Sequence, residues 1–454
     1  MKLNRFFAAF LSLALSLSLL AFPAAAEEPV LPEDPDIQTK AALLIDRDSG
    51  TMVYGKNEHD ELYPASLTKI MTALLTLEAI DSGKLSMDQQ ITVTASALEG
   101  LDADGSTAGL MVGEVLTVKN LMYCMMVVSA NEACDILAEA ISGSVEDFVE
   151  LMNQRAKELG CKNTHFVNPN GLHDSKHYTS AWDLYLITEE ALTHPDFLEI
   201  CDTPSYTVPA TNLSPERILR TTNYLIGSWY TAGYLYSGAH GVKTGSTSDA
   251  GHCLVATATR GSRSLLSVVL GGERLKLENN EIRTMSFYET RRLFDWGFDN
   301  FKYKTALTSL EMLDSVPVTL SQIDSVAVHA REDVELLMPK NLEPEDLERT
   351  LSLQESVEAP VTEGQEMGAV ELSYDGKVYA TVPLVALNDV EASKVLIFWA
   401  NVQEFFSRPA VRVGLIAAGS LIVGLSLLNL IFSRRRYRYG RPARRSRGYR
   451  GRRH

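Results

Sequence analysis

The feature that most constrains this chain is an uncharged apolar run of 20 residues, 413–432, near its C-terminus. A run of this length is long enough to cross the hydrocarbon core of a bilayer as a helix. The segment that follows, 433–454, carries eleven arginines and no acidic residue. Arginines beside a spanning helix are typical of the cytoplasmic side, so we expect a cytoplasmic tail and an extracytoplasmic main domain. A nucleic-acid-binding tail is the alternative, but a position against the membrane favours contact with anionic lipid.

The N-terminus has the three parts of a secretory signal peptide. A basic start with Lys2 and Arg5 precedes an apolar run over 6–22, and a small-residue Pro-Ala-Ala-Ala site follows at 23–26. We therefore predict a signal peptide over 1–26 and a linker over 27–37. An uncleaved membrane anchor is the alternative.

Acidic residues are confined to the part of the chain between these two ends, since all 58 Asp and Glu lie within 27–412. Such an acidic exterior argues against nucleic acid as a partner. The five cysteines are too few and too unevenly spaced for a disulfide framework. No His/Cys group has the spacing of a metal site, so we expect no cofactor.

The exported part divides into two regions. In the first, 38–302, strand patterns stand at both ends with helical patterns between them, which predicts an α+β fold with one antiparallel sheet and helices packed on it. The predicted segments are a hairpin (41–46 and 51–54), helices within 66–200, strands near 241–243, 252–259 and 264–270, and a helical end over 281–298.

The second region, 303–391, contains short β-like segments and a hairpin signal at 374–377, which predict a separate small all-β domain. A juxtamembrane segment, 392–412, connects it to the predicted span. The aromatic stretch 395–406 within that segment is either an interfacial helix leading into the membrane or the last packed element of the β domain.

Three short motifs in the first region carry candidate chemistry. The first, Ser66-Leu67-Thr68-Lys69, opens a segment that is apolar nearly all round, so we expect a central, buried helix. Ser66 falls in its first turn, where free N–H groups favour negative charge, and Lys69 projects from the same face. Burial lowers the pKa of a lysine, which makes Lys69 a candidate base for the Ser66 hydroxyl. A surface lysine is the alternative.

The second motif, Ser129-Ala130-Asn131, separates two helical patterns, 117–128 and 132–141. A polar triplet between helices can direct a hydroxyl and an amide into a cleft. Ser129 is a candidate for passing a proton to a leaving amine, and Asn131 for a hydrogen bond to a substrate amide. A helix break with Ser129 as N-cap is the alternative.

The third motif, Lys243-Thr244-Gly245, ends a predicted strand. On an edge strand its backbone can pair with an extended peptide, and Gly245 leaves room for a close approach. Lys243 and Thr244 are then placed to meet a terminal carboxylate. The backbone N–H groups of Ser66 and Ser246 are candidate oxyanion donors. An ordinary solvated strand end is the alternative.

In this order the motifs supply a nucleophile, an amine, a second hydroxyl and a cationic strand, the parts of an enzyme that forms an acyl-serine on an amide bond. The set resembles the serine penicillin-binding and β-lactamase superfamily. It is most similar to the low-molecular-weight D-alanyl-D-alanine carboxypeptidases. Other stretches that match the pattern of this family are 41–54, 168–173, 177–183 and 359–364.

The resemblance covers residues 38–390 and implies a transpeptidase-like catalytic domain over 38–302 with a β-sandwich-like domain over 303–391. It implies removal of the terminal D-alanine from peptidoglycan stem pentapeptides and covalent inhibition by β-lactam antibiotics. One departure stands out: family members often end in an amphipathic anchor, whereas this chain has a predicted span and an arginine-rich tail.

Three other functions stay open. A β-lactamase must hydrolyse its acyl-enzyme quickly, and class A enzymes use a dedicated glutamate in this step. No Glu-x-x-Leu-Asn pattern occurs between Asn131 and Lys243. An endopeptidase, or an enzyme that passes the acyl group to an amine, would use the same motifs, because cleft shape decides the acceptor. Intact motifs argue against a non-catalytic cell-wall or sporulation scaffold.

Overall fold

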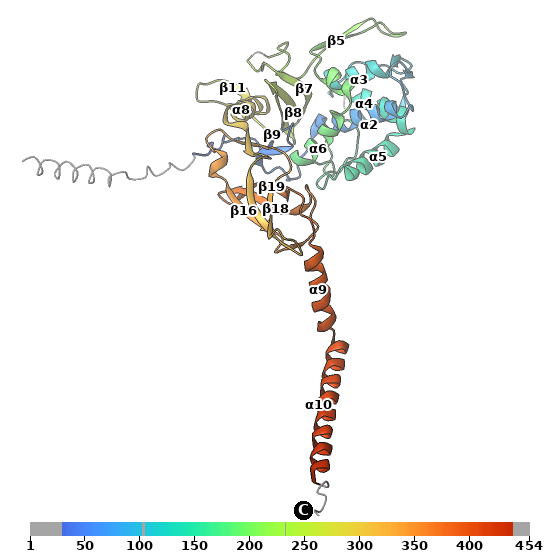
Figure 1. Cartoon of the computed structure of the whole chain (residues 1–454). Helices are drawn as coiled ribbons and strands as arrows, with labels where there is room; N and C mark the ends of the chain where they lie inside the picture. The colour runs from blue at the N-terminus through green and yellow to red at the C-terminus, as the bar shows by residue number, and fades with distance from the viewer. Residues whose placement is uncertain (1–29, 102–104, 232, 439–454) are drawn as a thin grey trace, which may run out of the picture. The chain divides into compact units, whose positions relative to one another are not determined.

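The computed structural model describes residues 30–101, 105–231 and 233–438 (Figure 1). Contacts divide the chain into two compact units. One comprises Tyr303 and the residues before it, together with Leu337–Glu343, and the other comprises Lys304–Leu336 and the residues from Pro344 onward. The predicted signal peptide and the end of the tail lie outside the described residues.

An antiparallel sheet of five strands organises the first unit, in the order β2-β1-β9-β8-β7. The predicted hairpin and the two strands joined by a tight turn are confirmed, and the strand that carries the third motif is the edge strand. The strands are β1 (Ala41–Asp46), β2 (Thr51–Lys56), β7 (Ala239–Thr247), β8 (Gly251–Arg260) and β9 (Arg263–Gly272).

Helices cover both faces of this sheet, as the predicted α+β fold requires (Figure 1). Besides the 3₁₀ turns η1 (Ala65–Thr68) and η2 (Ser96–Leu98), the helices are α2 (Lys69–Asp81), α3 (Val118–Val127), α4 (Asn131–Ser142), α5 (Val145–Glu158), α6 (Ala181–Ala191), α7 (Pro195–Cys201) and α8 (Met285–Asn300).

Every residue of β1 is buried, because alternate side chains enter two different cores. Leu43 and Ile45 pack with the helices α2–α7, whereas Leu44 packs with the apolar face of α8. Helix α2 is buried on nearly all sides, as its composition predicted. The sheet is thus the middle layer, and α2 lies at the centre of the helical layer.

The helical end of the first region begins four residues later than predicted. Ile282–Thr284 forms the strand β11, which pairs with β10 (Arg274–Lys276), and α8 starts at Met285. Backbone pairing with β10 competes with helix formation for these residues. Two further two-stranded sheets are formed by β3 (Gln90–Thr92) with β4 (Val115–Thr117) and by β5 (Ser205–Val208) with β6 (Arg217–Arg220).

The second unit is built mainly of strands, as predicted. Its six-stranded sheet has the order β16-β18-β19-β14-β13-β17, and Tyr374 pairs with Lys377 at the predicted hairpin. The elements from the end of α8 onward are β12 (Phe301–Leu307), β13 (Met312–Thr319), β14 (Ser325–Ala330), β15 (Val334–Pro339), η3 (Pro344–Asp346), β16 (Glu348–Leu353), β17 (Val357–Glu358), β18 (Glu366–Tyr374) and β19 (Lys377–Ala386).

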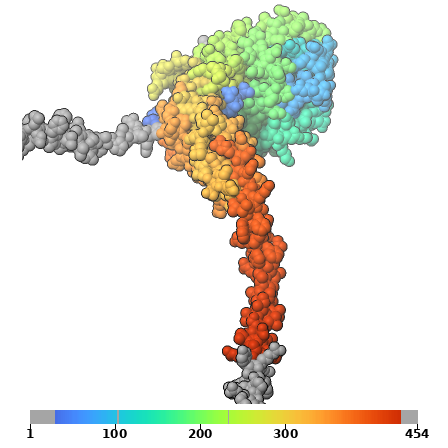
Figure 2. Space-filling view, viewed as in Figure 1, coloured from blue at the N-terminus to red at the C-terminus, as the bar shows by residue number. Residues whose placement is uncertain are grey.

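Two helices follow, α9 (Lys394–Ser407) and α10 (Pro409–Arg438). Helix α9 buries none of its residues, so it is not a packed element of the β-rich unit (Figure 2). Its exposed side chains include Phe398, Trp399 and Phe405. Within the described residues, α10 is the one helix long and apolar enough to cross a membrane, which is consistent with the predicted anchor.

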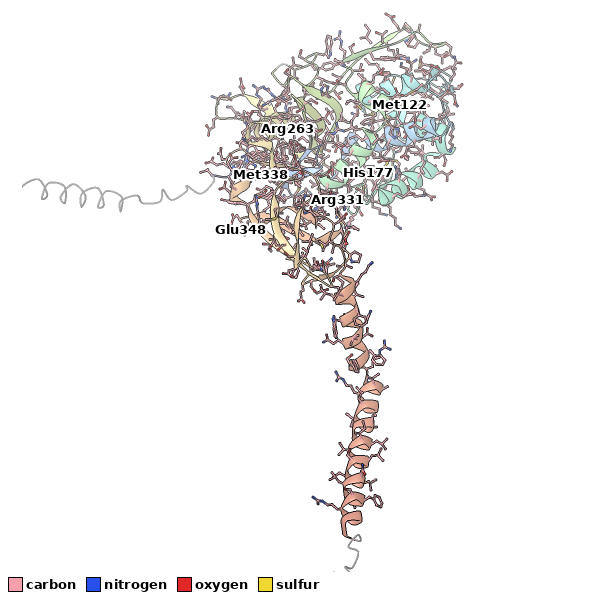
Figure 3. The ribbon with its side chains drawn as sticks, viewed as in Figure 1. Met122, His177, Arg263, Arg331, Met338 and Glu348 are labelled. Carbon is pink, nitrogen blue, oxygen red and sulfur yellow. The ribbon has the colours of Figure 1, made fainter. Side chains whose placement is uncertain are left out.

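A buried carboxylate holds the end of β1 in place through hydrogen bonds. Asp46 is fully buried and accepts hydrogen bonds from Arg263 Nε and Nη2, each at 3.3 Å, and from the Tyr303 hydroxyl at 2.6 Å (Arg263 is labelled in Figure 3). Arg263 also donates to the Phe301 carbonyl at 2.8 Å. The cluster therefore ties β1, β9 and the chain after α8 together.

Asp46→Ala should destabilise the protein by about 3–5 kcal/mol, because it removes the buried carboxylate and leaves the partly buried Arg263 cation without its charged partner. Thermal or urea unfolding of the detergent-solubilised chain measures the change. Asp299→Ala is the matched control, since Asp299 pairs with Arg260 at the surface and an exposed pair contributes about 0–1 kcal/mol. Equal losses in the two variants would contradict this account of the cluster.

Candidate active site

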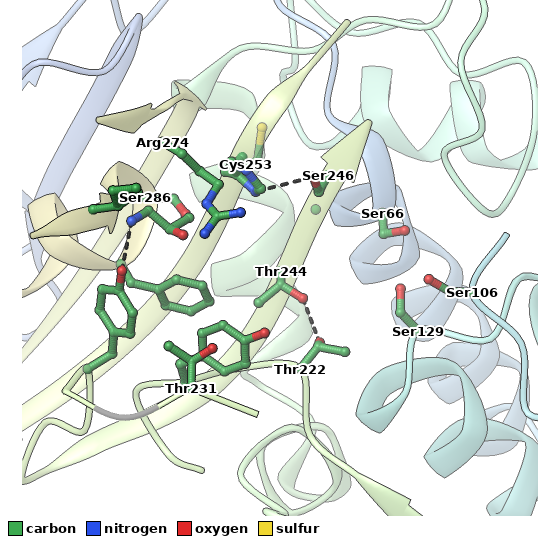
Figure 4. Close-up of a pocket in the computed structure, with 17 residues that line it drawn as sticks. Ser66, Ser106, Ser129, Thr222, Thr231, Thr244, Ser246, Cys253, Arg274 and Ser286 are labelled. Carbon is green, nitrogen blue, oxygen red and sulfur yellow. Dashed lines mark hydrogen bonds between the residues drawn. The ribbon is translucent and has the colours of Figure 1, made fainter. Parts of the chain in front are cut away.

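A cavity of about 380 Å³ opens beside the edge strand β7 (Figure 4). Its walls come from η1, from the segments before α4 and after β6, and from β7, β8, β10 and β11. Five of the predicted site residues line it, namely Ser66, Ser129, Thr244, Gly245 and Ser246. The other three, Lys69, Asn131 and Lys243, are buried.

The first motif places a hydroxyl and an amine in contact. Ser66 lies in the 3₁₀ turn η1, and Lys69 is the first residue of α2. Side chains three residues apart in a 3₁₀ turn lie nearly above one another. Lys69 Nζ therefore reaches Ser66 Oγ and donates to it at 2.9 Å.

The hydrogen-bond acceptors of the Lys69 amine are neutral. Nζ also donates to Asn131 Oδ1 at 2.8 Å and to the Asn170 carbonyl at 2.6 Å, so its three donors all have acceptors. Lys69 is fully buried, and burial lowers its pKa. A lowered pKa increases the fraction of neutral amine, which is the form that can take a proton from Ser66.

The turn that carries Ser66 is held by contacts on its inner side. Thr68 Oγ1 donates to the Ala65 carbonyl at 2.9 Å, and His177 Nε2 lies 2.8 Å from the same hydroxyl. The Val167 N–H donates to His177 Nδ1 at 3.2 Å, so Nε2 carries the proton. Burial lowers the pKa of His177 to about 4, and this neutral ring fixes η1.

The second motif directs its hydroxyl into the cavity. Ser129 has a left-handed backbone conformation (φ 65°), and its side chain faces Ser66 (Figure 4). Ser129 Oγ is buried and has no hydrogen-bond partner among the described residues. The N-cap of α4 is Ala130, so Ser129 does not cap that helix. A buried hydroxyl without a partner is available to a ligand.

Neighbouring side chains of the third motif lie on opposite faces of β7. Thr244 and Ser246 face the cavity, whereas Lys243 is buried and its Nζ donates to the Thr244 carbonyl at 3.0 Å. Burial, and secondly the charge of Lys69, lower the pKa of Lys243 to about 7. Gly245 is needed for packing as well, because a Cβ there would lie 2.7 Å from the Pro64 carbonyl oxygen in front of η1.

Sequence reasoning missed other polar residues that shape the site. Thr222 Oγ1 lies 2.6 Å from Thr244 Oγ1, and Arg274, from β10, lines the cavity. Asn170 accepts from Lys69, and Asp135 lies behind Asn170. The 168–173 stretch matched a family pattern and so marked the neighbourhood of Asn170. No local signal marked the other three, which are isolated polar residues in the sequence.

Comparison with known proteins identifies the family of this chain. A family model described as D-alanyl-D-alanine carboxypeptidase matches residues 28–274, and one described as the C-terminal domain of penicillin-binding protein 5 matches 301–392. The D-alanyl-D-alanine carboxypeptidase DacF of Bacillus subtilis is 33% identical over 361 residues, which cover 80% of this chain and 88% of that protein.

Solved structures extend the likeness to the fold. Penicillin-binding protein 5 of Haemophilus influenzae superposes with a TM-score of 0.61 at 31% identity, covering 80% of this chain and 99% of that one. Penicillin-binding protein 6B of Escherichia coli gives a TM-score of 0.58 at 29% identity, covering 79% and 98%.

Gly171→Ala should displace the Ser66 turn. Gly171 has φ 86°, and a Cβ there would lie 1.9 Å from the Ala65 carbonyl oxygen. We expect the rate of covalent labelling by a fluorescent penicillin to fall at least about tenfold, since a small misplacement of a reacting group is costly. The control is Gly160→Ala, with φ 85° but no atom within 4 Å of the added Cβ. Equal labelling rates in the two variants would show that this packing does not position Ser66.

Proposed function

We propose that this chain, which belongs to the D-alanyl-D-alanine carboxypeptidase family, removes the terminal D-alanine from peptidoglycan stem pentapeptides through an acyl-enzyme on Ser66. The same serine binds penicillin covalently. The observation that carries the proposal is the 2.9 Å contact between the buried Lys69 amine and the Ser66 hydroxyl at the wall of a cavity.

Acylation begins with neutral Lys69, which takes the proton of Ser66. The Ser66 oxygen then attacks the carbonyl carbon of the penultimate D-alanine. The negative oxygen that forms is received by the backbone N–H groups of Ser66 and Ser246. Asn131 holds the substrate through an amide hydrogen bond, while its Oδ1 keeps Lys69 in place.

The terminal carboxylate is bound at the other end of the cavity. Thr244 and Thr222 offer a pair of hydroxyls 2.6 Å apart, and the Arg274 guanidinium points into the same space (Figure 4). Lys243 adds positive potential from beneath the strand, since its amine is buried behind Thr244. This arrangement selects substrates that end in a carboxylate.

Release of D-alanine requires a proton on its nitrogen. The proton that Lys69 took from Ser66 reaches the departing amine through Ser129 Oγ, which faces Ser66 and has no hydrogen-bond partner among the described residues. Ser129 gives its own proton to the amine as the carbon–nitrogen bond breaks and receives the Lys69 proton in exchange. Water then attacks the acyl ester and restores free Ser66. No acidic side chain is among the described residues that line this cavity.

The predicted signal peptide and the apolar C-terminal helix support a reaction at the cell surface. Signal peptide 1–26 exports the catalytic domain, 38–302, and the β-rich domain, 303–391. The apolar helix then crosses the membrane over 413–432, and the arginine-rich tail, 433–454, remains in the cytoplasm. This topology keeps the active site on the side of the membrane where peptidoglycan lies.

Ser66→Ala should abolish both D-alanine release from a diacetyl-Lys-D-Ala-D-Ala type peptide and labelling by a fluorescent penicillin. Both reactions need the Ser66 oxygen as nucleophile. Ser142→Ala, at the end of α4, is the control and should keep both activities. Survival of either reaction in Ser66→Ala would remove Ser66 from its assigned role.

Arg274→Ala should raise KM for the same peptide about tenfold with little change in kcat, since a charged hydrogen bond to a carboxylate contributes about 1.5–3 kcal/mol. Steady-state kinetics of D-alanine release measure both constants. Lys276→Ala removes a positive charge from an exposed position of the same strand and should leave KM unchanged. If the two variants behave alike, Arg274 does not bind the carboxylate.

A further inference from the structure

Asp135 is a buried acid that the proposed mechanism does not use. It lies on α4 one turn after Asn131, on the same face, and is only 6% exposed. Both carboxyl oxygens lie 3.3 Å from Asn170 Nδ2. No other hydrogen bond to this carboxyl occurs among the described residues, so Asn170 is its hydrogen-bonding contact.

Asn170 connects this carboxyl to Lys69. Its side-chain nitrogen donates to Asp135, and its side-chain oxygen accepts from the Leu172 N–H at 2.9 Å. These two bonds fix the residue, which is 3% exposed, and its backbone carbonyl accepts from Lys69 Nζ at 2.6 Å. A single residue, Asn170, therefore links Asp135 to the Lys69 amine that takes the Ser66 proton.

Asp135 makes no direct ion pair among the described residues, and its carboxyl is hydrogen-bonded to a neutral amide. The three direct acceptors of Lys69 are neutral, and burial raises the pKa of Asp135 to about 7 while it lowers that of Lys69. The other titratable groups that act on the two are Glu132, Cys134 and Glu139 of α4, Lys243 of β7 and His177 of the loop before α6.

We propose that Asp135 is a positioning residue for Lys69. Through Asn170 it fixes the carbonyl that receives the Lys69 hydrogen bond, and its negative charge favours the ammonium form of Lys69 over the amine. The inference rests on the proposed function, in which the neutral amine deprotonates Ser66. Asp135 thereby sets the pH above which the serine can be acylated.

The test is the pH dependence of the penicillin labelling rate of the full detergent-solubilised chain. Asp135→Asn keeps an oxygen for Asn170 Nδ2 but removes the charge. Loss of a nearby negative charge lowers the pKa of Lys69, so neutral amine persists to lower pH. The midpoint of the acid limb should move down by about one pH unit. Asp135→Glu keeps the charge and should keep the midpoint near that of the unchanged chain.

Asp147→Asn is the matched control, because it removes the same charge from the exposed start of α5 and should not move the midpoint. The labelling rate constant describes only the folded molecules that react with penicillin. Partial misfolding of a variant lowers the amount of labelled protein but does not change this constant. A midpoint that stays in place in Asp135→Asn, or moves up, overturns the inference alone. Absence of labelling at every pH in the unchanged chain overturns the proposed function.

Discussion

The burial of one amine beside one hydroxyl is the constraint on which the rest of the structure depends. A lysine in an apolar core is costly unless each of its donors is satisfied, and Lys69 meets this condition with a serine, an asparagine side chain and a backbone carbonyl. Within the part of the chain that the structure describes, no carboxylate is hydrogen-bonded to it. A direct ion pair would hold the amine in its charged form, whereas neutral acceptors leave it able to exchange a proton. The turn before α2, the start of α4 and the turn at Asn170 each supply one of these acceptors.

Much of the fold could be predicted because its strongest signals are local. The hairpin of β1 and β2, the buried α2 and the turn between β18 and β19 each follow from a pattern within about ten residues. The start of α8 could not be predicted in this way. Ile282–Thr284 has a composition that suits a helix or a strand, and its pairing with Arg274–Lys276 decides the outcome through contacts that no periodicity reveals.

The site residues likewise fall into two groups, those that the local sequence predicts and those that only the fold brings together. Ser66 and Lys69 were predictable as neighbours because they lie three positions apart at the start of a helix, whereas the edge position of the third motif is known only from the strand order of the folded sheet. Thr222, Arg274 and Asp135 were not predictable, since an isolated threonine, arginine or aspartate is ordinary in any exported chain. Only the fold brings Thr222 within 2.6 Å of Thr244 and sets Asp135 behind Asn170. The alternation that buries Lys243 while Thr244 faces the cavity also depends on which face of β7 the helices cover.

Two buried lysines with different contacts explain how one site can act as a base and still attract an anion. Lys69 contacts Ser66, the proposed nucleophile, and burial lowers the pKa of Lys69, which favours the neutral amine. Among the described residues, Lys243 Nζ donates to the carbonyl of its own strand neighbour, and burial, followed by a charge on Lys69, lowers the pKa of Lys243 to about 7. When Lys69 is neutral this repulsion is absent, so the protonated form of Lys243 is favoured in the state that is ready to react. The positive potential beneath Thr244 is then strongest when the base is free, and carboxylate binding and serine activation favour the same protonation state.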